Sequence, residues 1–280
     1  MSFSSEVKEE LSKINTFSKN NLLESELVGY IYSANTNRAE KQYEFITENE
    51  FNIERIYKIL FKLNINYEPE MKRKVYVAKF QTNDIRKIEQ INDEEEKKAL
   101  IRGLFLGSGS INDPNKKYHL EILLKENDIS KYIKNLLKEA NIKAKILEGK
   151  NTLYIKEGEE ISKLLAYIGA QKAVLKFEEI RVMRDIRNNI NRVVNCETAN
   201  LNKTVSAAVT QIEAINFLKK MKKFEELPEN LIEIAELRIE NPEMSLKELG
   251  ECLEEPIGKS GANHRLKKII EIADEVKRGI

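Results

Sequence analysis

Two stretches of the chain repeat the same order of hydrophobic and polar positions. Each begins with an apolar helical segment, at residues 27–35 in the first copy and 101–109 in the second. Each continues with an alternating run typical of a strand, then with apolar residues at helical spacing, and ends in an Asn-Ile pair. Because repetition of this length indicates a duplicated structural unit, the pattern predicts two similar half-domains, at about residues 21–92 and 93–180.

Small residues on the two repeated helices predict how the halves pair. Gly29 and Ser33 lie one turn apart on the first helix, and Gly103 and Gly107 do so on the second. Glycine allows two helix backbones to touch, at a cost of about 1 kcal/mol of helix propensity for each residue. We therefore predict that these four residues are contacts in a central helix pair. The order helix, strands, helix in each half predicts an α+β domain.

Helical patterns dominate outside the repeat. At the N-terminus, Phe3, Val7 and Leu11 recur at helical spacing, which predicts an amphipathic helix that covers part of the first domain. After the repeat the strand patterns stop. We therefore expect four segments, which are an N-terminal helix (1–20), the duplicated domain (21–180), a helical linker (181–226) and an all-α domain (227–280).

The last of these segments has the pattern of a helix-turn-helix. Asn241-Pro242 ends a first helix, since proline disfavours a helical residue before it. Ser245 and Glu248 fit a capping box that opens a short second helix. A turn follows, and a third helix begins near Ser260. Three helices with a short second one and a turn before the third match a helix-turn-helix.

Local charge indicates that the third helix contacts DNA. Residues 256–270 contain four basic residues and no acid, although residues 228–280 as a whole are acid-rich. In this motif the side chains at the start of the third helix reach base edges, and the backbone amides there can hold a phosphate. A three-helix packing module with a solvated basic face is the alternative. The candidate DNA-binding residues are Ser245, Lys247, Lys259, Ser260, Gly261, Asn263, His264, Arg265, Lys267 and Lys268.

Arginine and asparagine residues are concentrated in the predicted linker. Both side chains suit phosphate oxygens, so this segment is a second candidate for contacts with the DNA backbone. The same composition also fits a solvated helix face with capped turns, and the spacing does not distinguish the two. The candidate backbone contacts are Arg181, Arg184, Arg187, Arg192 and Lys203.

Bulk composition limits the function classes. The chain has 47 Lys and Arg residues against 46 Asp and Glu residues, so any affinity for nucleic acid must come from local patches. Cys196 and Cys252 lack the spacing of a metal site and fit a reducing cytoplasm. We find no secretory signal and no apolar run near the ~20 residues that span a bilayer. We expect a cytoplasmic protein with no membrane, metal or cofactor.

The two repeated helices resemble those of LAGLIDADG homing endonucleases, over roughly residues 22–180. In that family two such helices pair at the centre of a saddle-shaped sheet that lies on DNA, and an acidic residue at the eighth motif position holds the catalytic metal ions. The matching positions here are Ala34 and Ser108, which supply no carboxylate for a divalent cation. The resemblance therefore implies the fold without the chemistry. A metal-dependent DNA endonuclease or RNA maturase that uses other acids, such as Asp113 or Glu121, is the alternative.

Taken as a whole, the chain is similar to the WhiA family of bacterial regulators. The most specific segments are residues 195–200 (Asn-Cys-Glu-Thr-Ala-Asn) and residues 258–266. The resemblance implies a non-cleaving LAGLIDADG-like saddle followed by a helix-turn-helix that binds promoters, in sporulation or in cell division and chromosome segregation. We therefore expect a nucleoid-associated regulator of double-stranded promoter DNA, with no catalytic residue. Its saddle could also contact a sigma factor or another protein, and a protein scaffold with weak DNA binding is the remaining alternative.

Overall fold

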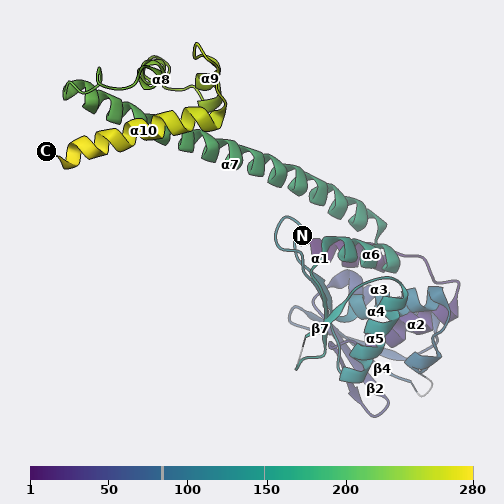
Figure 1. The fold of residues 1–280 in the computed structure, drawn as a ribbon. Coiled ribbons are helices and arrows are strands. Elements are labelled where there is room, and N and C mark those ends of the chain that lie inside the picture. Colours follow the sequence, from purple (N-terminus) through teal and green to yellow (C-terminus); the bar gives the residue numbers. More distant parts are fainter. Residues whose placement is uncertain (83–84, 148, 280) are drawn as a thin grey trace. The chain divides into compact units, whose positions relative to one another are not determined.

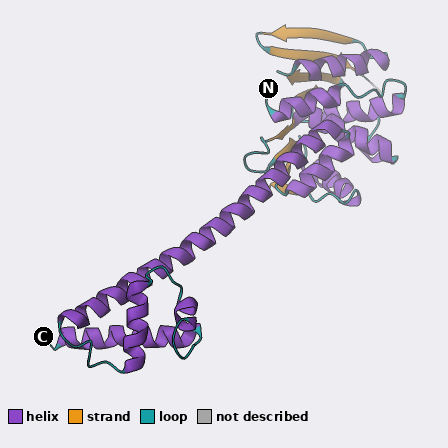
Figure 2. Cartoon of the chain, turned by 90° about the horizontal axis from the view of Figure 1, so that it is seen from above, coloured by secondary structure: helices purple, strands orange, loops and turns teal. Residues whose placement is uncertain are grey.

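The computed structural model describes residues 1–82, 85–147 and 149–279. It divides into two compact units, Met1–Ile186 and Arg187–Ile280. The first unit combines helices with strands, and the described part of the second unit is helical (Figures 1 and 2). These two architectures confirm the predicted fold class, which is a duplicated α+β domain followed by an all-α domain.

The first unit contains two halves with the same order of elements. The first half contains α2 (Asn20–Tyr32), β1 (Thr36–Ala39), β2 (Gln42–Thr47), α3 (Glu50–Lys62), β3 (Tyr67–Lys72) and β4 (Val75–Gln81). The second half contains α4 (Glu94–Ser108), β5 (Gly109–Ile111), β6 (Leu120–Leu123), α5 (Asn127–Glu139), β7 (Lys145–Leu147) and β8 (Thr152–Ile155). The antiparallel sheets have equivalent strand orders, β1-β2-β4-β3 and β5-β6-β8-β7, so the halves are a structural duplication.

Further elements flank the halves. They are α1 (Phe3–Ser12), the short 3-10 helix η1 (Ile88–Gln90) and α6 (Gly158–Ile168). The helix α1 buries Phe3, Val7 and Leu11, as the helical spacing predicts, and its N-cap Ser2 accepts a hydrogen bond from the Ser5 amide. Its apolar face therefore joins the core of the first unit.

The strand β3 was not predicted from the sequence. It is an edge strand with Pro69 in its middle, and all of its residues are at least partly exposed. Proline is tolerated on an edge because its missing N–H faces away from the sheet. A strand without a buried face has no alternating pattern, so hydrophobicity does not reveal it.

The helices α2 and α4 touch backbone to backbone through their glycines. A Cβ atom added to Gly103 would lie 2.0 Å from the carbonyl oxygen of Glu26, and one added to Gly29 would lie 2.3 Å from the carbonyl oxygen of Leu100. Both distances are far below van der Waals contact. The helix pair therefore depends on the absence of a side chain at these two positions.

A buried ionic cluster lies beside this helix pair. Arg55 of α3 donates hydrogen bonds from Nε and Nη2 to the two carboxylate oxygens of Glu26, each at 2.8 Å. Arg102 of α4 donates from Nε to the same carboxylate at 3.1 Å. Burial alone would raise the pKa of Glu26, but the hydrogen bonds and positive charge of the two arginines outweigh it and lower that pKa. Glu26 therefore remains ionised and links α2, α3 and α4.

The second unit contains the end of α7 (Gln171–Lys220), α8 (Glu229–Glu240), α9 (Leu246–Glu251) and α10 (Lys259–Arg278). The sequence pattern predicts a linker over residues 181–226, but Ala214, Ile215 and Leu218 of α7 lie in the hydrophobic core with α8 to α10. Their helical spacing gives α7 an apolar face there, so this end of the helix packs with the three that follow. Among the described residues, no helix combines the length and the apolar character that crossing a bilayer requires.

Candidate nucleic-acid interface

The three C-terminal helices are held together by a small apolar core, by a capping box at the start of α9 and by hydrogen bonds of Arg238. Leu249 of α9 and Leu266 of α10 are fully buried. Ser245 and Glu248 form a reciprocal capping box at the start of α9, in which the Ser245 amide donates to Glu248 Oε2 at 2.7 Å and the Glu248 amide donates to Ser245 Oγ at 3.3 Å. The capping box begins α9 at the residue that the sequence pattern predicts.

Arg238 fixes the connection between α8 and α9. Its side chain is buried, and Nη1 donates a hydrogen bond to the carbonyl oxygen of Met244 at 2.7 Å, with longer contacts to Asn241 and Pro242. Burial lowers the pKa of this arginine. Helical spacing places Arg238 on the packed face of its helix, but its carbonyl partners depend on the turn geometry and could not be derived from the sequence.

The first half of α10 presents an exposed polar and basic face. Its exposed positions recur one turn apart and lie opposite the buried Ala262, Leu266 and Ile269. The side chain of Lys267 is 71% exposed and that of Lys268 is 50% exposed. Both ammonium groups are therefore accessible to a phosphate. The exposed residues of this half are Lys259, Ser260, Asn263, His264, Lys267 and Lys268.

One acid lies at the end of this face. Glu271 is 3.6 Å from Lys268 and 4.0 Å from Lys267. Exposed pairs at such distances are worth about 0–1 kcal/mol and are easily exchanged for a phosphate partner. Glu271 therefore weakens the positive charge of the two lysines slightly but leaves both ammonium groups able to bind a phosphate.

Arg265 differs from its neighbours on α10. Its side chain is 19% exposed and lies against α8, with Nη1 3.9 Å from Glu233 and 3.4 Å from the carbonyl oxygen of Asn230. The helical spacing places Arg265 away from the buried face, but it does not show that α8 supplies these partners. In the structure Arg265 contributes to the α8–α10 contact.

The remaining residues that the sequence predicts as DNA contacts lie near the N-terminal ends of α9 and α10. Lys247 is exposed on α9, 3.7 Å from Glu251, whereas the hydroxyl of Ser245 is already used by the capping box. The N-cap residue of α10, Gly258, supplies no side-chain cap, so the first backbone amides of this helix, which include those of Ser260 and Gly261, have no side-chain acceptor there. Uncapped amides at a helix start suit an anion.

The basic residues predicted on the linker separate into two groups. Arg184 donates from Nη1 to the carbonyl oxygens of Pro114 and Lys116, each at 2.6 Å, and stacks over the Tyr118 ring. Arg181 pairs with Glu178 at 2.9 Å. Arg184 thus attaches the first part of α7 to the segment between β5 and β6, whereas the Arg181–Glu178 pair lies within α7. The other three, Arg187, Arg192 and Lys203, are exposed on α7.

The two motif positions that lack an acid are used for backbone contacts. The Ala34 amide donates to the carbonyl oxygen of Leu123 at 3.0 Å, and the Ser108 hydroxyl donates to the same oxygen. Beside them, Gly107 leaves room for Ser33, whose Oγ would lie 2.4 Å from a Cβ at that glycine. The ends of the helix pair are therefore fastened to β6 by hydrogen bonds and present no carboxylate.

The acids of the alternative enzyme hypothesis are engaged elsewhere. Asp113 accepts hydrogen bonds from the backbone and side-chain nitrogens of Asn115, which lower its pKa and mark a turn. Glu121 contacts the Ser110 hydroxyl at 3.2 Å and His119 at 3.3 Å. Within residues 1–82, 85–147 and 149–279, no three His, Cys, Asp or Glu side chains are grouped as a metal site requires.

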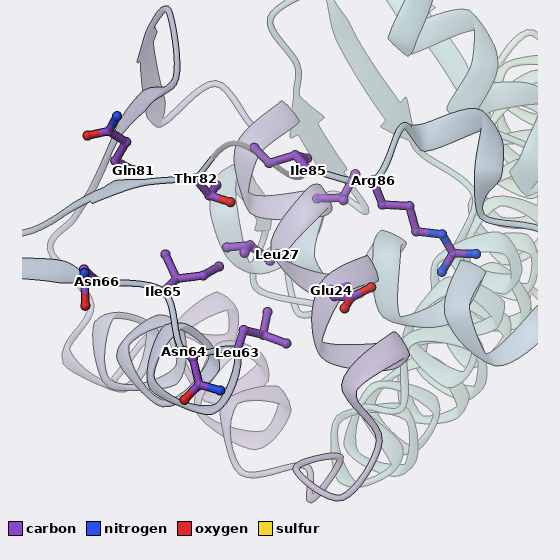
Figure 3. Close-up of a pocket in the computed structure, with 11 residues that line it drawn as sticks. Glu24, Leu27, Leu63, Asn64, Ile65, Asn66, Gln81, Thr82, Ile85 and Arg86 are labelled. Carbon is purple, nitrogen blue, oxygen red and sulfur yellow. The ribbon is translucent and has the colours of Figure 1, made fainter.

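A cavity of about 570 Å³ opens between α2 and the ends of α3 and β4 (Figure 3). It is lined by Glu24 and Leu27 of α2, and by Arg86 from the segment after β4. Arg86 is already bound to Glu96 at 2.7 Å and to the carbonyl oxygen of Gln90. Its cation is therefore engaged, and we assign no ligand to this cavity.

Two family models match the chain. The WhiA LAGLIDADG-like domain matches residues 32–93 and 97–187, and the WhiA C-terminal HTH domain matches residues 190–273. Together they account for most of the sequence.

Individual relatives are also named as WhiA proteins. The chain is 52% identical over 191 residues to a probable cell division protein WhiA of Clostridium perfringens, and 50% identical over 192 residues to that of Clostridium botulinum. Each match covers 68% of this chain, and the chain spans 60% and 61% of the length of these relatives.

A solved structure extends the similarity to nearly the whole chain. The crystal structure of full-length DUF199/WhiA from Thermatoga maritima is 32% identical, with a TM-score of 0.65, over 98% of this chain and 99% of that one. That structure and this one therefore share the architecture of both the LAGLIDADG-like domain and the C-terminal helices.

Proposed function

The chain belongs to the WhiA family, and from this membership we propose that it is a sequence-specific DNA-binding regulator of transcription, without nuclease activity, that acts in bacterial cell division or sporulation. Its place of action is the nucleoid, in the cytoplasm. The third helix of the C-terminal domain, α10, enters the major groove of promoter DNA. The three exposed basic residues of α7, Arg187, Arg192 and Lys203, contact the DNA backbone.

The observation that carries this proposal is the exposed face of α10. Asn263 and His264 can donate to base edges, and Lys267 and Lys268 can contact flanking phosphates. No acid of the same domain lies within residues 256–270, so this segment carries a local positive charge where α10 would meet DNA. Arg265 supports the orientation of this helix through α8 and is not assigned to base contacts.

Replacing Lys267 and Lys268 together with alanine should weaken binding to promoter DNA by about tenfold or more, because two charge-assisted contacts are lost. The slope of log affinity against log salt should fall by about 1–2, since each phosphate contact contributes roughly 0.9. Fluorescence anisotropy with a labelled promoter duplex over a salt series measures both quantities.

The matched control is Lys277→Ala with Arg278→Ala, which removes the same charge from the far end of α10. We expect less than a twofold change in affinity for this variant. Equal losses for both pairs would show that charge, and not the face of α10, determines binding.

Incubation of the protein with supercoiled DNA and Mg²⁺ or Mn²⁺ separates this proposal from the enzyme alternative. We expect the DNA to remain supercoiled, because Ala34 and Ser108 offer no anionic oxygen to a metal. Metal-dependent cleavage that disappears in Asp113→Asn would favour the enzyme.

A second candidate function is a protein scaffold, and one observation favours it. The exposed face of the first sheet mixes Glu44, Glu68 and Glu70 with Lys79, which is 2.8 Å from Glu70. A cavity of about 490 Å³ lies over this face. Such a mixed surface suits a protein, such as a sigma factor, better than a DNA backbone. A partner that remains bound after nuclease treatment of the extract would support this role.

A further inference from the structure

A polar cavity of about 610 Å³ lies where the two motif helices end. Its lining comes from α1, from the loops around Ala34 and Glu48, and from the start of β5 at Gly109. The volume is within the range of about 300–1,000 Å³ that small-molecule sites occupy. The N-terminal helix thus forms one wall of a cavity at the C-terminal ends of α2 and α4.

Lys8 of α1 lines this cavity without a partner. Its ammonium group forms no hydrogen bond or ion pair with a residue that the structure describes, whereas Lys13 on the same helix is 2.5 Å from Glu9. Burial lowers the pKa of Lys8 to about 8. A half-buried cation that is left unpaired is costly unless an anion joins it.

Three serine hydroxyls that line the cavity with Lys8 each accept one hydrogen bond and keep their protons free. Ser2 Oγ accepts from the Ser5 amide at 3.2 Å, Ser4 Oγ from the Ile111 amide at 3.3 Å, and Ser5 Oγ from Asn49 Nδ2 at 3.3 Å. None of the three donates to a described residue. A hydroxyl that already accepts is left with its proton to give, so the three together favour an acceptor-only ligand.

We propose that this cavity binds the oxyanion of a phosphate group, with Lys8 as its counter-ion and Ser2, Ser4 and Ser5 as neutral donors. Four donors from the start of α1 and its N-cap match the several oxygens of a phosphate better than the two of a carboxylate. Glu48 is the other charged side chain among the described lining residues, and it is exposed to solvent. The phosphate belongs to a small nucleotide-sized molecule or to a DNA backbone.

The source of the phosphate decides how the site relates to the proposed function. A small phosphate ligand would make the saddle a ligand-binding domain, independent of the face of α10. A backbone phosphate would rest on the DNA-binding role and add a second contact to it. The test therefore uses both probes.

The experiment is an amide chemical-shift titration of the full chain with inorganic phosphate, and in parallel with a short DNA duplex. The duplex arm uses the Lys267→Ala, Lys268→Ala background, so that a failure of the α10 contact does not hide this site. We expect saturable shifts at the amides of Ser4, Ser5 and Lys8 in at least one arm. The dissociation constant should rise tenfold or more in Lys8→Met and change less than twofold in Lys13→Met.

Lys8→Arg keeps the positive charge and should retain most of the affinity, which separates loss of charge from loss of folding. Phosphate affinity should also fall as the pH rises above about 8, because Lys8 deprotonates there.

Saturation by phosphate alone identifies a small ligand, and saturation by the duplex alone identifies the DNA backbone. Absence of saturable shifts in both arms, or equal affinity of Lys8→Met and wild type, would overturn the proposal.

Discussion

We expect Glu26→Gln to lower the free energy of unfolding of the first unit by about 3–5 kcal/mol, the usual cost of removing one partner from a buried ion pair. The amide has nearly the same shape as the carboxylate, so the loss is electrostatic. Both Arg55 and Arg102 would be left without their anion in a site where the Glu26 side chain is fully buried. Urea unfolding followed by circular dichroism measures the change.

The control is Glu24→Gln on the same helix, where the carboxylate is exposed and the expected change is within about 0.5 kcal/mol. The effect also has a defined pH dependence. Because the folded-state pKa of Glu26 lies below its ordinary value of 4.5, its contribution is complete above that pH and is lost as the pH falls through the folded pKa. The difference between wild type and Glu26→Gln should therefore be constant near neutrality and narrow below about pH 4.5. A difference that persists unchanged in acid would contradict the ionised state of Glu26.

The second large effect is expected for Gly103→Ala, which should destabilise the first unit by about 3 kcal/mol, at the upper end of typical overpacking costs. Helix propensity alone would favour alanine by about 1 kcal/mol. The new methyl group would lie 2.0 Å from the carbonyl oxygen of Glu26, which is backbone and cannot turn aside, so the two helices must separate. Thermal or urea unfolding shows directly whether the substitution lowers or raises the free energy of unfolding.

A glycine in the same unit provides the comparison. The atoms nearest to a Cβ at Gly158, the first residue of α6, belong to the side chains of Tyr118 and Arg181, at 3.2 Å and 3.3 Å. These groups can shift by a few tenths of an ångström, and we expect Gly158→Ala to change stability by less than about 1 kcal/mol. If Gly103→Ala were as mild as Gly158→Ala, the close helix pair described above would be wrong.

The repeated pattern was sufficient to predict the duplicated domain and its helix pair, because hydrophobic periodicity and small residues are local features. The same holds for the capping box at Ser245, where both partners lie within one turn. The edge strand with Pro69 was missed because it buries no face of its own.

Partners that are distant in sequence were not predictable. Glu26 is an acid within an apolar helix, which signals a buried charge, but nothing nearby indicates that its partners are 29 and 76 residues away. Arg265 and Arg184 have exposed positions by helical spacing, yet each is engaged by groups on another element. Lys8 was not predicted as a site residue, because its isolation depends on which side chains the fold brings to the same cavity.

The central claim is that this chain recognises a particular DNA sequence and leaves it intact. Genome-wide sequencing of the DNA bound to the protein in cells tests it most directly, with the Lys267→Ala, Lys268→Ala variant as the comparison. We expect a shared sequence upstream of a small set of genes, with uncut DNA at each site and loss of these sites in the variant. Bound fragments without a common sequence, the same sites retained by the variant, or strand breaks at the bound positions would contradict it.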